Sequence, residues 1–98
     1  MNAELQRHVH EAIARLDHVL ERGADASHAE IQAATLSILA FRDRALKMHR
    51  EGTASKTYLD KANVLLSLAY GGEFPLSGLH HNRFEQTRDG LRQMLDGA

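Results

Sequence analysis

The stretch SHAEIQAATLSILAFRDRALKMHR, Ser27 to Arg50, decides the fold class. It opens with Ser27 and, three positions later, Glu30, which is the pattern of a helix capping box. It then runs to Arg50 without proline or glycine, and Gly52 follows as a stop signal. Its apolar residues recur at the three- and four-residue spacing of an α-helix rather than the alternation of a strand. The stretch therefore predicts a long helix over residues 28–50.

The apolar residues of this helix cover more than half of its circumference. Leu36 and Ala40 lie away from the main stripe, which is formed by Ile31, Ile38, Leu39, Ala45 and Leu46. A helix with one solvated face needs only a single stripe. We therefore expect this helix either to be central in the fold or to bury a second face against a partner.

Helical stripes of the same kind occur on both sides of this segment. They predict three further helices, at residues 3–22, 56–70 and 83–96. Gly23 is expected to end the first of them, and Asn82 with Glu85 repeats the capping-box pattern before the last. Gly90 lies inside the last helix, where glycine costs about 1 kcal/mol relative to alanine. The last helix is therefore expected to be the weakest.

Length and composition favour one small globular domain over residues 1–98. The chain has 98 residues, of which 43% are hydrophobic and 26% charged. Helices joined by short connections usually pack as antiparallel neighbours. We expect an all-α, up-and-down bundle of four helices, with too little interior for a deep active-site cavity.

The connector at 71–82 contains the only proline of the chain. Gly71 and Gly72 are expected to end the third helix with positive φ, and Pro75 prevents its continuation. Three apolar residues in the connector predict that it folds back and caps one end of the bundle: Phe74, Leu76 and Leu79. A recognition loop for a partner, or a metal or catalytic site, are the alternatives.

Charge and motif content disfavour several classes of function. Twelve basic and thirteen acidic residues give a formal charge of -1, which does not favour nucleic-acid binding. The chain has no cysteine, no apolar segment typical of a signal peptide, and no stretch near the roughly 20 residues that span a bilayer. Neither the Glu-x-x-His pairs of di-iron bundles nor a zinc-protease or phosphate-binding motif occurs. We expect a cytoplasmic, bacterial, non-enzymatic protein without a cofactor.

Two polar residues, Arg42 and His49, continue the stripe of residues 28–50 that is predicted to be buried. A buried arginine must be paired, because an unpaired charge in a low-dielectric interior costs several kcal/mol. Its candidate partners are Asp17, Asp60 and Glu85. Arg42 could instead extend its stem to the edge of the bundle or bind an anionic ligand, and His49 could bond the last carbonyls of its helix.

These patterns support two hypotheses of function. The first is a helical protein-interaction module that self-associates, for example as a homodimer, through an apolar face to which Val64 and Leu68 contribute. The second is a small-ligand or metal-binding bundle in which five polar side chains converge on one pocket: Arg42, His49, Tyr58, His80 and His81. The adjacent histidines are only weak candidates for metal ligands, because neighbouring residues on a helix point about 100° apart.

Overall fold

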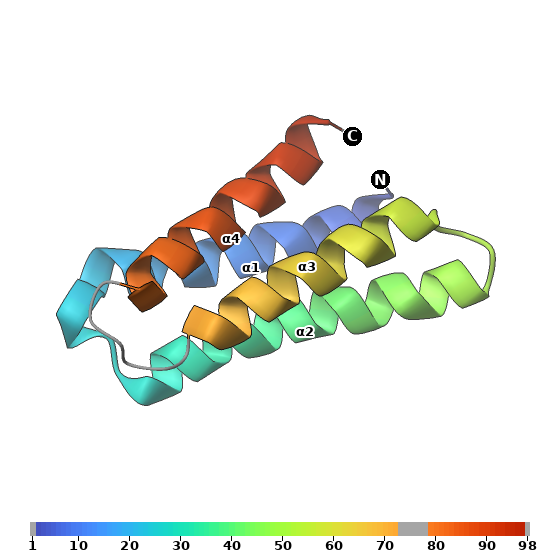
Figure 1. The fold of residues 1–98 in the computed structure, drawn as a ribbon. Coiled ribbons are helices and arrows are strands. Elements are labelled where there is room, and N and C mark those ends of the chain that lie inside the picture. Colours follow the sequence, from blue (N-terminus) through green and yellow to red (C-terminus); the bar gives the residue numbers. More distant parts are fainter. Residues whose placement is uncertain (1, 73–78, 98) are drawn as a thin grey trace.

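The computed structural model describes the backbone of residues 2–72 and 79–97, and the side chains of residues 2–70 and 82–97. It contains four α-helices and one short 3-10 helix (Figure 1): α1 (Ala3–Arg22), η1 (Gly23–Asp25), α2 (His28–Arg50), α3 (Lys56–Gly72) and α4 (Leu79–Asp96). The described residues include no strand. The predicted all-α fold with four helices is confirmed.

The four helices lie along one another and form a bundle 41 Å long and 20 × 19 Å across. Each helix packs against the next in the chain, and α4 returns to pack against α1. Figure 1 places both chain termini at the same end of the bundle. Over the part of the chain that is described, each helix is too short or too polar to cross a membrane.

The core is built from apolar side chains of all four helices, and Phe41 and Phe84 are its largest fully buried members. Two buried threonines accompany them. The hydroxyl of Thr35 donates to the carbonyl of Ile31 at 3.4 Å, and that of Thr87 donates to the carbonyl of Arg83 at 2.7 Å. Both hydroxyls are therefore satisfied within their own helix, so that they can be buried without a partner across the core.

The ends of α2 follow from local sequence. At its start, the backbone N–H of Glu30 donates to Ser27 Oγ at 3.1 Å, and the N–H of Ser27 donates to the Glu30 carboxylate at 3.0 Å. At its end, Gly52 takes φ 78°, and the N–H groups of Gly52 and Thr53 bond the carbonyls of His49 and Met48. This is the Schellman arrangement, which only a residue with positive φ completes easily. The predicted capping box is confirmed.

The facing ends of α3 and α4 differ from the prediction. Helix α3 continues through Gly71 to Gly72 instead of ending at residue 70, and α4 begins at Leu79 instead of after Asn82. Asn82 is therefore inside a helix and does not cap one. Glycine and asparagine lower helix stability by about 1 kcal/mol or less each, a cost that a helix packed along one face can bear. The predicted apolar cap formed by Phe74, Leu76 and Leu79 lies outside the described side chains.

Candidate interaction surface

Arg42 and His49 lie at the edge of the core rather than inside it. The Nε atom of Arg42 is 3.1 Å from the carboxylate of its neighbour Asp43, and the Arg42 side chain is 29% exposed. Asp17, a predicted partner, instead pairs with two arginines of α4. The ring of His49 donates from Nδ1 to the carbonyl of Ala54 at 3.3 Å, so it holds the turn after α2.

The residues of the ligand-binding hypothesis do not meet at one place. His49 and Tyr58 flank the turn between α2 and α3, and Tyr58 packs against the core. His80 and His81 lie in the first turn of α4, at the opposite end of the bundle, and their side chains are outside the described residues. Among the described side chains, no group of three or more His, Asp or Glu could hold a metal ion.

Val64 and Leu68, the two residues predicted to contact a partner, differ in exposure. Val64 is 62% exposed, whereas Leu68 is half-buried and packs against the core. Two other large apolar side chains are also exposed, Leu36 at 53% and Tyr70 at 43%. Val64 is therefore available to a partner, while Leu68 already contributes to the bundle itself.

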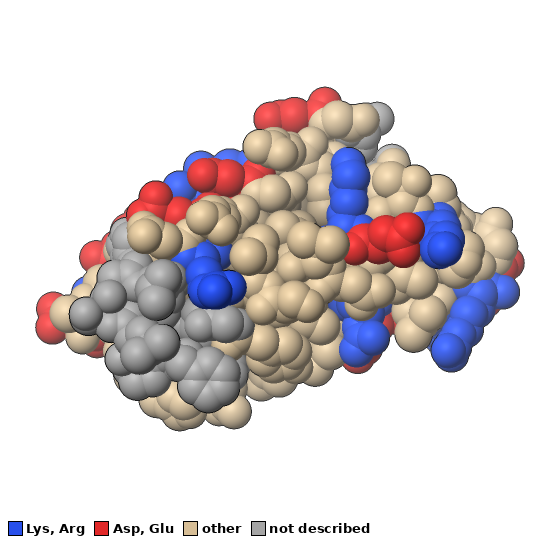
Figure 2. Space-filling model, viewed as in Figure 1, with Lys and Arg blue, Asp and Glu red and all other residues tan. Residues whose placement is uncertain are grey.

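The three large apolar residues that are exposed among the described side chains belong to two helical segments that contain no charged residue. Residues 31–41 of α2 and 62–70 of α3 lack Asp, Glu, Lys and Arg. Because α2 and α3 run antiparallel and pack together, these segments lie side by side. We call their exposed side chains the uncharged face. Figure 2 shows a broad tan area over α3 and the adjoining part of α2, with charged side chains around its border.

A groove of about 310 Å³ lies between α3 and α4 beside this face. Val64, Leu65, Gly90, Gln93 and Met94 line it, and its two charged lining residues are Asp60 and Lys61. A Cβ atom at Gly90 would lie 2.5 Å from Cδ2 of Leu65. Gly90, which looks like a weak point of α4 in the sequence, therefore lets Leu65 of α3 pack directly against the backbone of α4.

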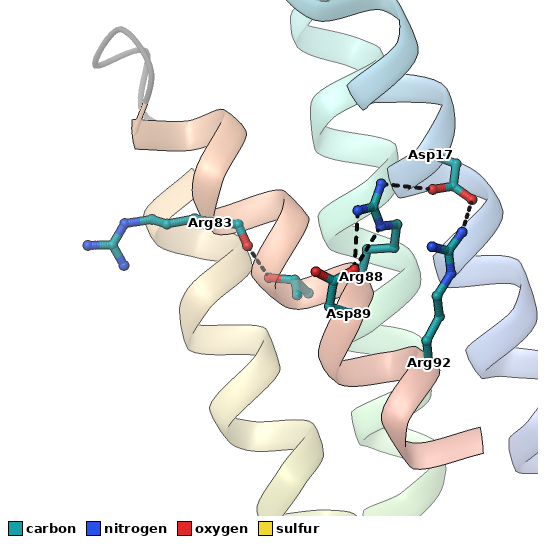
Figure 3. A network of polar contacts seen from close by, with 6 residues as sticks. Asp17, Arg83, Arg88, Asp89 and Arg92 are labelled. Atoms are coloured by element: carbon teal, nitrogen blue, oxygen red, sulfur yellow. Dashed lines mark hydrogen bonds and ion pairs between the residues drawn. The ribbon is translucent and has the colours of Figure 1, made fainter. Parts of the chain in front are cut away.

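On the side away from this groove, ion pairs join α4 to α1 (Figure 3). The carboxylate of Asp17 accepts from Arg88 at 3.5 Å and from Arg92 at 3.1 Å. Arg88 also pairs with Asp89 at 3.2 Å. Burial works against the charge of Arg88, but the hydrogen bond and charge of Asp89, together with Asp17, outweigh it and raise the pKa of Arg88. These ion pairs therefore stabilise the packing of α4 against α1.

A second groove, between α1 and α2, is lined by residues that pair with one another. Glu30 contacts Nε2 of His18, and its carboxylate lies 3.0 Å from Nε of Arg22. The pKa of Glu30 falls to about 2, chiefly through the backbone hydrogen bond from Ser27 and then through His18 and Arg22. Arg15 pairs with Glu11 on the same side. The charged groups of this groove thus connect α1 to the capping box of α2.

None of the family models, curated proteins or solved structures compared with this chain matches it. The surface features of the chain itself therefore carry the functional argument.

Proposed function

We propose that the chain is a non-enzymatic helical interaction module that self-associates through the uncharged face. The observation that carries this proposal is the position of Leu36, Val64 and Tyr70, the large exposed apolar residues of the described chain, on two adjacent helical segments without charge. Single exposed apolar residues are normal on a protein surface, but their concentration on two adjacent uncharged segments is typical of a contact site.

A second copy of the chain fits this face better than a strongly charged partner. In a two-fold symmetric dimer the same patch meets itself, so that a single charge on the two-fold axis would face its own copy. The uncharged face avoids this repulsion, because residues 31–41 and 62–70 contribute no charge. The near-neutral formal charge of -1 also favours a protein partner over nucleic acid, because a chain without excess positive charge gains little from phosphate groups.

A cysteine-free chain is also suited to the cytoplasm, where we place this module.

Replacing Val64 or Leu36 by glutamate tests the proposal. Both side chains are more than half exposed, so the bundle should tolerate the change, while a dimer would have to bury the new carboxylate. We expect Val64→Glu and Leu36→Glu to shift the protein from dimer to monomer in light scattering after gel filtration. Circular dichroism should show unchanged helix content.

Ala3→Glu is the matched control, because Ala3 is an exposed apolar position in the first turn of α1 and lines neither groove. This variant adds the same charge to a helix surface and should remain dimeric. Dimers of equal strength in all three variants would contradict the proposal.

A further inference from the structure

We infer that the second copy docks at the groove between α3 and α4, around a two-fold axis that passes beside α3 between Asp60 and Lys61. The inference rests on the proposed self-association and specifies its geometry. Val64 of each copy enters the groove of the other, and Asp60 of each copy pairs with Lys61 of the other.

The shape of this surface fits a copy of itself. Val64 projects at the edge of the groove and is 62% exposed, beside the hollow of about 310 Å³ between α3 and α4. A ridge and a hollow therefore lie next to each other on one surface. A two-fold rotation exchanges the two partners, so each ridge meets the opposite hollow in a single contact.

The charges at the edge of the groove are also self-complementary. Asp60 and Lys61 are exposed, and within residues 2–70 and 82–97 neither forms an ion pair or a hydrogen bond. Their charges are therefore available to a partner. Antiparallel copies of α3 related by the two-fold axis bring each acid within one helical turn of the partner's base. In the groove between α1 and α2, by contrast, Glu30 is already paired with His18 and Arg22.

The surface area that a stable dimer must bury indicates that Asp60 and Lys61 belong to the contact. A specific interface buries about 800 Å² of each partner. One side of a bundle 41 Å long and 20 Å wide is hardly larger than this. A contact on this side must therefore extend beyond the uncharged face to the groove that Asp60 and Lys61 line. Such exposed pairs set the register of a contact more than they strengthen it.

Charge reversal and mixing test the inference. Asp60→Lys leaves two bases at the edge of the groove, and Lys61→Asp leaves two acids, so each variant repels its own copy. We expect each variant alone to dimerise at least tenfold more weakly than the original chain in sedimentation velocity. An equimolar mixture should restore dimerisation, because a base then faces an acid at both positions. Native mass spectrometry identifies the restored species, which should be the heterodimer.

Glu21→Lys on α1 is the control for net charge, since it changes the charge of the chain by the same amount as Asp60→Lys at an exposed site outside the groove. It should dimerise like the original chain and should not rescue Lys61→Asp. If the original chain dimerises but the two variants also do so, or if their mixture shows no preference for the heterodimer, the docking geometry is wrong and the proposed function stands. A monomeric original chain would instead contradict the proposed function, and the geometry with it.

Discussion

At Gly90, two effects on the stability of the bundle oppose each other. Alanine in place of glycine should favour helix α4 by about 1 kcal/mol. The added Cβ atom would, however, lie 2.5 Å from Cδ2 of Leu65, a side chain that is only 7% exposed. Forcing an extra carbon into a packed core costs about 1–3 kcal/mol. The close approach of α3 to α4 should therefore outweigh the gain in helix propensity.

A double-mutant cycle separates these effects. We expect Gly90→Ala alone to lower the free energy of unfolding by up to about 2 kcal/mol in urea denaturation. Once Leu65→Ala has removed the clashing side chain, the same substitution should raise the free energy of unfolding by about 1 kcal/mol. An equal effect of Gly90→Ala in both backgrounds would show that Leu65 is not the constraint.

Glu30 makes the stability of the bundle depend on pH. Its pKa is lowered from 4.5 to about 2 in the folded chain, first by the backbone hydrogen bond of Ser27. Between these two values the unfolded chain binds more protons at this site than the folded chain does, so its contribution to stability is present above pH 4.5 and is lost as the pH falls toward 2.

The variant Glu30→Gln isolates this contribution from those of the other carboxyl groups. We expect the urea midpoint of the original chain to fall more steeply than that of Glu30→Gln between pH 5 and pH 2, the window set by the lowered pKa. Parallel pH profiles of the two proteins would contradict this role of Glu30.

Among the helices, α4 is fixed to α1 by Asp17. Asp17 binds two arginines, of which the Arg88 side chain is 22% exposed and the Arg92 side chain 50% exposed. Solvent screens the more exposed pair more strongly. We expect Asp17→Ala to lower the free energy of unfolding by about 1 kcal/mol, and Arg88→Ala to lower it more than Arg92→Ala does. Thermal or urea unfolding measures these differences.

Glu21→Ala removes an exposed acid from the same helix and serves as the control, with an expected change near zero. A double-mutant cycle between Asp17 and Arg88 should give a coupling energy clearly above that between Glu21 and Arg88. Equal coupling energies would mean that the contact between α1 and α4 depends on apolar packing alone.

The helices themselves could be predicted from sequence because periodicity, the capping box at Ser27 and the stop at Gly52 are local features. The start of α4 could not, since the capping pattern of Asn82 competes with a longer helix whose stability depends on packing. The groove was also missed, because it requires the spacing between α3 and α4. Gly90 was the available signal: a glycine inside a helical stripe marks either a weak helix or a close contact, and sequence alone does not separate the two.

For the candidate surface, sequence reasoning identified Val64 but could not separate it from Leu68. Both widen the apolar stripe of α3, yet only the packing of the whole bundle decides that Leu68 is half-buried while Val64 remains 62% exposed. The predicted pairing of Arg42 across the bundle failed for Asp17 for a similar reason. Arg42 instead lies beside its neighbour Asp43 at 3.1 Å, although its buried Nε atom makes no hydrogen bond within the described part of the chain.

In the whole molecule, the large apolar side chains occupy two places, the core of the bundle and its surface. Among the described residues, most of the large apolar side chains form one core among four helices, and those that are exposed lie on α2 and α3. A domain of 98 residues has a limited core, so burying this face against a second copy would add stability that the single chain lacks. Unfolding of the protein should accordingly become more difficult as its concentration rises.

The mass of the untagged chain in sedimentation equilibrium, measured over a series of concentrations, tests self-association most directly. If the chain self-associates, its mass should rise with concentration toward twice the 10.9 kDa of one chain. The Val64→Glu variant should stay at the mass of one chain at every concentration. A mass of one chain for the original protein up to high micromolar concentration would contradict self-association.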